Sequence, residues 1–367
     1  MNALEGVNMK QVKQVLSLSA LALAILSVEA SASGPTIYGS LELALAHTDQ
    51  GRAINPNPNG NGRDVVVNPE SGTFLENNWS YVGFKGVEKL TDDFSVIYQI
   101  EVSVQDGNVA GVEDPISSRN TFLGFDTSWG TFTFGRTDTA FYNAEGNVDV
   151  FDNTNAWMAQ LMPGEDRQSN SVNYVSPSFG SQQFAVSGTV LMNDDNSTSD
   201  YPFSVATTLG DPDLQSTLYY VSAAYSKDVE DFKGYRGAAQ VRFNDLKLGA
   251  IFQNSEHITL RNIDGNMYYV TAQYNLNKLN LDGVNLKAMY GQDQTGLGDY
   301  FQGIVALNSN ISDVQVEQLT LGANYHASQA AIFYAFWANY KTDYDLNDVA
   351  QDVGTENVYT LGLRYYF

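Results

Sequence analysis

The chain has 367 residues, no cysteine and a formal net charge of −23 at pH 7. A surface this acidic repels nucleic acid, which excludes a DNA- or RNA-binding protein. Because cysteine is absent, disulfide bonds are excluded too, and the fold must be stabilised by hydrogen bonding and burial.

The first element along the chain is a predicted export signal. Lys10 and Lys13 give a positive start, the run from Gln14 to Val28 is uncharged, and Ala30-Ser31-Ala32 has the form of a cleavage site. The uncharged run is shorter than the ~18 residues that a membrane-spanning helix needs, so cleavage is favoured over anchoring. We expect residues 1–32 to be a signal peptide, with Met9 as an alternative start, and residues 33–367 to form one domain.

The rest of the chain is a succession of segments in which apolar and polar residues alternate. Clear examples are Thr36–Ala46, Phe94–Gln105, Leu246–Gln253 and Met267–Leu276. A period of two indicates β-strands, because successive side chains leave opposite faces of the pleated chain. A soluble β-sandwich alternates in the same way, so the period alone does not fix the fold class.

Three further features favour a barrel that spans a membrane. The polar faces carry charges that suit a wet interior, at Glu42, Glu101, Lys247 and Arg364. The segments are about ten residues long, enough to cross a bilayer when tilted. Short and long connections also alternate, as in outer-membrane barrels. The connections expected to be long are Thr48–Glu76, Asp106–Ser117, Asp138–Asp166, Asn193–Asp200, Asp228–Gly234, Asn254–Gly265, Gln292–Gln315 and Thr342–Glu356.

A first count of these segments is odd, which would leave the two ends of the domain on opposite sides of the membrane. The missing strand is best placed at Tyr201–Leu209, where apolar residues again recur at every second position. The ring must also close, because an open edge in lipid leaves backbone groups unpaired. We therefore predict an all-β fold, a 16-stranded antiparallel transmembrane β-barrel with long external loops.

Several motifs resemble the general porins of Gram-negative bacteria. Residues 82–90, Val-Gly-Phe-Lys-Gly-Val-Glu-Lys-Leu, are similar to a signature of that family. Ile37–Ser40 looks like its first strand, and Arg119–Phe125 followed by Gly130–Arg136 looks like its fourth and fifth. The last strand, Asn357–Phe367, resembles the aromatic-ended strand that the barrel assembly machinery recognises in this group, with Tyr365 and Phe367 as the assembly signal.

The resemblance implies a homotrimer in the cell outer membrane, each barrel being a water-filled channel for passive diffusion of small hydrophilic solutes and ions. It further implies that the third loop, Thr137–Asp166, folds into the lumen and sets its narrowest point. The acidic residues of this constriction would be Asp149 and Asp152, with Glu145 as a further candidate.

The opposing basic wall carries over onto Arg119 and Arg167, and less directly onto Arg136. Ser40 and Tyr81 stand where enteric members of the family usually have basic residues, so the basic wall is thinner here. Together with the net charge of −23, this predicts a preference for cations. The acidic residues could instead lie on outer loops, where salt screens them and divalent ions can bridge them to lipopolysaccharide.

Other functions have less support in the sequence. A substrate-selective channel of the same fold is the main alternative. An outer-membrane hydrolase would need a serine activated by a nearby base, and neither a G-x-S-x-G motif nor a convincing Ser/His pair is present, so we expect no enzyme. His47, His257 and His326 are isolated and no cysteine accompanies them, so we expect no metal site and no cofactor.

Overall fold

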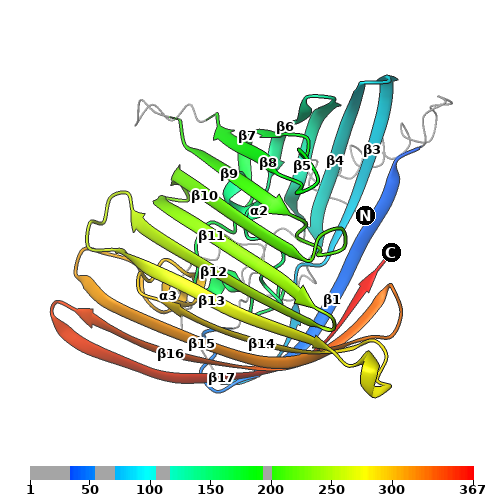
Figure 1. The fold of residues 1–367 in the computed structure, drawn as a ribbon. Helices are drawn as coiled ribbons and strands as arrows, with labels where there is room; N and C mark the ends of the chain where they lie inside the picture. Colours follow the sequence, from blue (N-terminus) through cyan, green and yellow to red (C-terminus); the bar gives the residue numbers. More distant parts are fainter. Residues whose placement is uncertain (1–33, 54–70, 105–115, 193–200) are drawn as a thin grey trace, which may run out of the picture. The chain divides into compact units, whose positions relative to one another are not determined.

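The computed structural model describes residues 34–53, 71–104, 116–192 and 201–367 (Figure 1). The predicted signal peptide lies outside the described residues, as does the greater part of three connections expected to be long, Thr48–Glu76, Asp106–Ser117 and Asn193–Asp200. Pro35–Phe367 form one compact unit.

The unit consists almost entirely of strands. They are β1 (Thr36–Thr48), β2 (Gly72–Asn77), β3 (Tyr81–Thr91), β4 (Phe94–Val104), β5 (Ile116–Thr127), β6 (Gly130–Thr137), β7 (Gln168–Val175), β8 (Ala185–Leu191), β9 (Phe203–Gly210), β10 (Tyr219–Val229), β11 (Phe232–Phe243), β12 (Leu246–His257), β13 (Asp264–Asn275), β14 (Val284–Asp293), β15 (Ile311–His326), β16 (Ala331–Leu346) and β17 (Val349–Tyr366). The described helices are short: α2 (Ala140–Asn143), α3 (Asp299–Ile304) and two single 3-10 turns, η1 (Met158–Gln160) and η2 (Asn277–Leu279). None of them is long and apolar enough to cross a membrane.

The strands pair antiparallel in chain order, and the sheet closes on itself. β1 pairs with β17 along one edge; along the other it pairs with β3 through residues 36–40 and with β2 through residues 43–48. β2 and β3 therefore share one position in the ring, and the seventeen strands fill sixteen positions. The predicted strand Tyr201–Leu209 is found as β9, which pairs with β8 and β10. The predicted 16-stranded barrel is confirmed.

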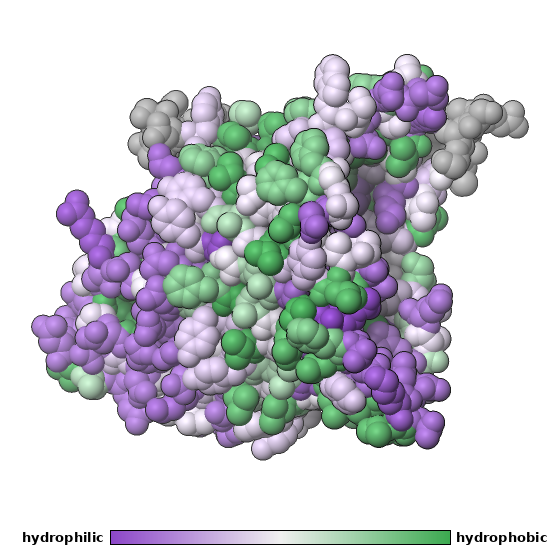
Figure 2. All heavy atoms as spheres, viewed as in Figure 1, coloured by the Kyte–Doolittle hydropathy of each residue, from purple (hydrophilic) through white to green (hydrophobic). Residues whose placement is uncertain are grey.

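The ring is apolar outside and polar inside. On β1, Leu41 and Leu45 are each 52% exposed, whereas Ser40 and Glu42 are 2% exposed. β17 repeats the pattern, with Leu361 exposed and Thr360 buried. Monomeric soluble proteins rarely expose apolar patches this extensive, but a bilayer requires them. In Figure 2, hydrophobic and near-neutral residues cover much of the face formed by the strands, and hydrophilic residues gather at the left edge, where hairpin ends lie in Figure 1.

Two of the connections expected to be long are tight turns instead. Asp228–Gly234 contains a turn of only two residues, Glu230 and Asp231, and Thr342–Glu356 contains the turn Asn347-Asp348. All four turn residues have positive φ, between 52° and 60°, the geometry of hairpin turns whose twist matches the strands. The expectation of long loops here is wrong because a polar hairpin that continues beyond the apolar band has the composition of a loop.

Candidate pore and its constriction

The third loop, residues 138–167 between β6 and β7, lies inside the ring. It begins with α2, whose N-cap Thr139 accepts a hydrogen bond from the Tyr142 backbone N–H at 3.0 Å. Polar side chains that point inward hold α2 on the wall: the Ala140 N–H donates to Thr189 Oγ1 of β8 at 2.8 Å, and the Phe141 N–H to Ser204 Oγ of β9 at 3.3 Å.

The tip of the third loop reaches the opposite wall. Asn155 Nδ2 donates to Glu76 Oε2 of β2 at 2.6 Å, and the Asn155 carbonyl accepts from the Tyr340 hydroxyl of β16 at 3.1 Å. Gln318 Nε2 of β15 donates to the Ala156 carbonyl at 2.8 Å. Because β8 and β16 are half the ring apart, the loop crosses the lumen, as expected for the third loop.

One arginine of the barrel wall forms hydrogen bonds to both ends of the third loop. Arg236 of β11 is 2% exposed. Its Nη1 donates to the Phe141 carbonyl at 3.2 Å, its Nη2 donates to the Pro163 carbonyl at 3.1 Å, and the same Nη2 lies 2.5 Å from Glu165 Oε1. Such a planar fork satisfies several oxygens in one plane, so Arg236 fixes where the loop leaves the wall and where it returns.

A second loop, residues 294–310 between β14 and β15, packs on the third loop. Its helix α3 contributes Tyr300 and Phe301, which are 1% and 0% exposed. The ring of Tyr300 stacks on Tyr340, with 4.3 Å between centroids. Met158 and Leu161 of the third loop belong to the same buried apolar cluster, together with inward side chains of β12–β16. This part of the lumen is therefore filled with packed side chains.

One group of charged lumenal residues lies on the third loop and on β1, β4, β5, β6 and β17. Arg364 of β17 pairs with Glu42 of β1, with 2.9 Å between Nη2 and Oε1, and donates to the Asp152 carbonyl at 3.0 Å. The carboxylate of Asp152 feels the charges of Arg364, Arg167 and Arg119. Burial raises the pKa of Asp152, and these three arginines oppose that rise.

A bulge brings Arg119 to this cluster. The register of β4 and β5 shifts at Glu101, so that two residues of β5, Arg119 and Asn120, lie opposite the single residue Glu101 of β4. A bulge of this kind changes the direction in which side chains point. Arg119 Nε lies 2.7 Å from Glu101 Oε1, and the Tyr38 hydroxyl donates to Glu101 Oε2 at 2.9 Å. The Arg119 guanidinium also lies 4.8 Å from the centroid of the Tyr81 ring.

The other two predicted arginines lie next to Arg119. Arg167 Nε is 3.3 Å from Asp138 Oδ1, and Asn120 Nδ2 donates to the other oxygen of that carboxylate at 2.8 Å. Arg136 of β6 donates to the Ser118 carbonyl and to Ser169 Oγ, both at 3.1 Å. Arg119 and Arg167 lie close enough to Arg136 for the three positive charges to repel one another. The structure therefore brings the three arginines and Asp152 into one neighbourhood.

Glu145 and Asp149 are placed differently. The Asp149 carboxylate accepts the Phe151 and Met158 backbone N–H groups, each at 2.7 Å, and so shapes the loop itself. Burial, and next the charge of Asp152, raises the pKa of Asp149 to about 7. Glu145 is buried beside Glu165 near Arg236, and burial together with the Glu165 charge holds its pKa well above its usual value. Ser40 is a buried inward residue of β1.

Sequence reasoning did not predict that two lysines contact the third loop. Lys247 Nζ of β12 donates to the Asn147 carbonyl, and Lys287 Nζ of β14 lies 5.8 Å from the centroid of the Phe151 ring. Alternation had placed Lys247 and Arg364 on polar faces, but it gave no sign of which segment of the loop each would meet. Among the residues that the structure describes, no three His, Asp or Glu side chains gather as metal ligands would.

Comparison with known proteins identifies the family that this architecture matches. A family model described as Gram-negative porin matches residues 17–346. The major outer membrane protein P.IB of Neisseria meningitidis serogroup B is 31% identical over 175 residues, which are 46% of this chain and 49% of that protein. The P.IB protein of Neisseria sicca is 29% identical over 167 residues, 44% of this chain and 43% of that protein. The matches thus span about half the length of these curated relatives.

Solved structures agree in fold. OmpT of Vibrio cholerae with loop L8 deleted gives a TM-score of 0.65 at 16% identity, over 91% of this chain and 99% of that one. An anion-selective porin from Comamonas acidovorans gives 0.64 at 16% identity, over 91% and 99%. Salmonella typhi OmpF in complex with daunomycin gives 0.64 at 15% identity, over 91% and 97%. The comparisons confirm the resemblance to porins, the outer-membrane location and the expectation that the chain is not an enzyme.

Proposed function

The chain belongs to the Gram-negative porin family, and from this membership we propose that it forms a water-filled channel through which small hydrophilic solutes and ions diffuse passively. The observation that carries the proposal is the third loop, which crosses a closed ring and leaves charged side chains of both signs facing one part of the lumen. Sixteen strands enclose a lumen wide enough for water, and the loop sets how much of it remains open.

The constriction in this proposal lies between Asp152 of the third loop and the arginines of the wall, Arg119, Arg136 and Arg167. Charges of opposite sign on facing sides place a transverse field across the water column, while the bore excludes large solutes. Glu145 and Asp149 lie on the same loop as Asp152 and belong to the acidic side of the proposed constriction. Ser40 and Tyr81 leave the basic wall thinner.

We further propose that the channel prefers cations. Four lumenal arginines are each paired with a carboxylate: Arg119 with Glu101, Arg167 with Asp138, Arg236 with Glu165 and Arg364 with Glu42. Their charges are therefore largely neutralised, whereas Asp149 and Asp152 add negative charge on the third loop. Arg136, Lys247 and Lys287 oppose these two charges, so the proposed preference rests on the thinner basic wall at Ser40 and Tyr81 and on the net charge of −23.

Two measurements test these proposals. In liposome swelling, uptake rates that fall smoothly with solute mass support a general diffusion channel, and saturable uptake of a single solute supports the substrate-selective alternative. In a KCl gradient across a planar bilayer, the reversal potential gives the sign of selectivity. A reversal potential that shows chloride preference in the unmodified protein would refute the cation preference.

The proposed assembly is a homotrimer inserted by the barrel assembly machinery. Tyr365 and Phe367 at the C-terminal end of the chain are 47% and 53% exposed. An assembly signal must be exposed in this way for another protein to bind it. Export by a cleaved signal peptide at residues 1–32 predicts that the mature protein starts at Ser33, which N-terminal sequencing tests. Acidic outer residues would contact lipopolysaccharide through divalent cations, so chelation should lower trimer stability in native membranes.

A further inference from the structure

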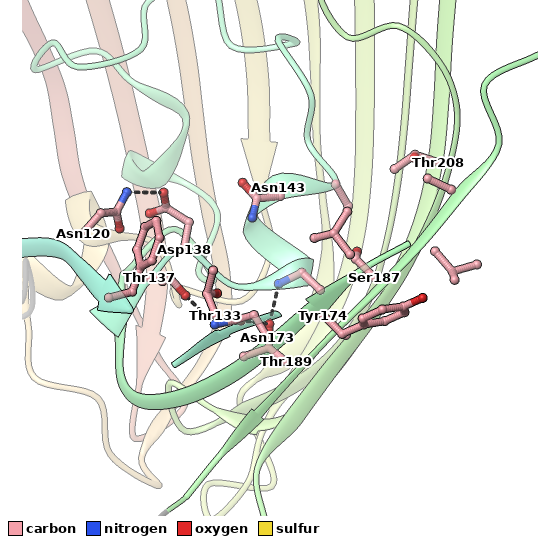
Figure 3. Close-up of a pocket in the computed structure, with 17 residues that line it drawn as sticks. Asn120, Thr133, Thr137, Asp138, Asn143, Asn173, Tyr174, Ser187, Thr189 and Thr208 are labelled. Carbon is pink, nitrogen blue, oxygen red and sulfur yellow. Dashed lines mark hydrogen bonds between the residues drawn. The ribbon is translucent and has the colours of Figure 1, made fainter. Parts of the chain in front are cut away.

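A hollow of about 430 Å³ opens beside α2, between the third loop and the wall formed by β5–β9. Its volume lies within the ~300–1,000 Å³ of small-molecule sites. In Figure 3, Asn143 on α2 and Asn173, Thr189 and Ser187 on the wall lie around this space, with Asn120 and Asp138 at one end. The hollow therefore adjoins the charged cluster through Asp138.

The lining of the hollow is nearly uncharged and combines amide and hydroxyl groups with a larger apolar surface. Its amide and hydroxyl groups come from Asn120, Thr133, Thr137, Asn143, Asn173, Tyr174, Ser187, Thr189 and Thr208, and Asp138 is the one lining residue of an acidic or basic type. The charge of Asp138 is already engaged by Arg167 and by the Asn120 amide. The hollow thus offers an ion no net charge to hold it, unlike the neighbouring constriction.

Many of these groups have no hydrogen-bond partner within the described part of the chain. Asn120 Oδ1 is a buried acceptor without a hydrogen-bond partner there. The side chains of Thr133, Asn143, Ser187 and Thr208 likewise make no hydrogen bond to described residues, although those of Thr137, Asn173 and Thr189 bond to one another or to α2. Amides and hydroxyls both donate and accept, as the hydroxyl groups of a sugar do. The apolar surface, which suits the C–H faces of a sugar, comes from Phe122, Ala140, Ala144, Val175, Ala185 and Val186.

We infer that this hollow is a weak binding site for neutral polyhydroxylated solutes of the size of a mono- or disaccharide. The inference rests on the proposed channel function, because such a solute would reach the hollow through the lumen. An uncharged solute leaving the constriction would exchange its water for the amides and hydroxyls of the hollow, while ions pass along the charged residues. Neutral and charged solutes would then follow partly separate paths past the third loop.

Maltose is a suitable probe. In a planar bilayer, maltose should lower the KCl current of the unmodified protein with a saturable concentration dependence, whereas a polyethylene glycol of similar radius lowers it only in proportion to concentration. The triple variant Asn143→Ala/Ser187→Ala/Thr208→Val should raise the half-saturating maltose concentration about tenfold or more, because each lost hydrogen bond of ordinary strength costs a severalfold loss of affinity. The matched control Ser226→Ala removes an inward hydroxyl of β10 that lies outside the hollow and has no hydrogen-bond partner among the described residues; it should keep the maltose effect.

A maltose response that is linear, or that the triple variant leaves unchanged, overturns the inference. Saturation-transfer NMR on the detergent-solubilised barrel separates this outcome from failure of the channel. A barrel that does not conduct but transfers saturation to maltose supports the binding site and refutes the channel. A barrel that conducts yet shows neither saturable block nor transfer retains the channel and refutes the binding site.

Discussion

Arg364 on the last strand forms an ion pair with Glu42 on the first, and the same guanidinium donates to the Asp152 and Asn153 carbonyls of the third loop. One side chain thus stabilises both the seam of the ring and the position of the loop that narrows it. The Tyr334 hydroxyl donates to the same Glu42 carboxylate at 2.8 Å. Closure of the barrel and the geometry of the constriction are therefore linked.

The first prediction concerns this pair. In a double-mutant cycle with Arg364→Gln and Glu42→Gln, we expect a coupling free energy of about 1–3 kcal/mol in the stability of the folded barrel, because contacting charged groups in one network do not act additively. Urea unfolding in lipid vesicles measures it. The exposed pair Lys89–Asp92 is the matched control, since its side chains are 63% and 98% exposed and surface pairs contribute little. Equal coupling in the two cycles would contradict the role given to Arg364.

The second prediction concerns pH. The pKa of Asp149 is raised to about 7, chiefly by burial and then by Asp152. Deprotonation as pH rises through 7 adds negative charge to the third loop, so cation preference should increase between pH 6 and pH 8. Because the folded-state pKa is raised, the stability that the protonated group contributes is fully present at acidic pH and is lost as pH rises through about 7.

Asp149→Asn should flatten this pH dependence of the reversal potential. Asp211→Asn is the control. The backbone N–H and the hydroxyl of Ser216 both donate hydrogen bonds to Asp211 and lower its pKa to about 2. The charge of Asp211 is therefore constant between pH 6 and pH 8. A pH dependence that survives Asp149→Asn unchanged would assign it to another group.

The third prediction concerns Glu356 of β17, which is 0% exposed. Its carboxylate accepts the Arg52 N–H at 2.9 Å, the Ala53 N–H at 3.1 and 3.2 Å, and the Tyr300 hydroxyl at 3.0 Å. It therefore joins the start of the first loop to α3. Glu356→Ala should release the loop of residues 294–310, giving faster limited proteolysis there and larger current fluctuations.

Glu356→Gln should give an intermediate result, because the amide keeps one acceptor oxygen but loses the second. Asp282→Asn, in an exposed turn, is the control and should match the unmodified protein. If Glu356→Ala leaves proteolysis of residues 294–310 and the current noise unaltered, Glu356 does not hold this loop.

The fourth prediction concerns the last residue. The Gly39 N–H donates to the Phe367 carbonyl at 3.0 Å, and the Phe367 N–H donates to the Gly39 carbonyl at 3.1 Å. Deleting Phe367 removes both ladder bonds and the exposed aromatic ring. We expect a severalfold fall in folded protein in the outer membrane, measured by heat-modifiable migration in gels, and near-normal assembly of Phe367→Tyr.

Refolding of purified protein into detergent separates recognition from stability. A deletion variant that refolds in detergent but fails in cells has lost the assembly signal, whereas one that fails in both has lost the closing bonds. Normal amounts of the deletion variant in the outer membrane would contradict both roles.

The barrel was predictable because each strand has one face in water and one in lipid, which imposes a period of two on the sequence. Closure then required an even count, which placed a strand at Tyr201–Leu209, and the structure has that strand as β9, at Phe203–Gly210. Loop composition was less informative: Asn347-Asp348 looks like part of a long loop but is a two-residue turn, because polar strands can continue beyond the bilayer. Local composition does not record where pairing ends.

The contacts around the proposed constriction were predictable only in part. Family resemblance grouped Asp152 with the arginines, and the structure brings these residues into one neighbourhood. The resemblance did not indicate the bulge that puts both Arg119 and Asn120 inside, since a bulge depends on the register of the partner strand. It also did not reveal that Asp149 binds backbone N–H groups of its own loop, or that Arg364 reaches that loop. The contacts of Arg364 join residues more than 200 positions apart, which alternation along one strand cannot predict.

The central claim is that the third loop narrows an open, water-filled channel without closing it. Single-channel recording of the purified protein in planar bilayers tests it most directly. We predict stepwise conductance that is ohmic in KCl, three equal closing steps for each insertion at high voltage, and a larger step when Arg236→Ala loosens the third loop. Insertion of folded barrels without any conductance would contradict the account.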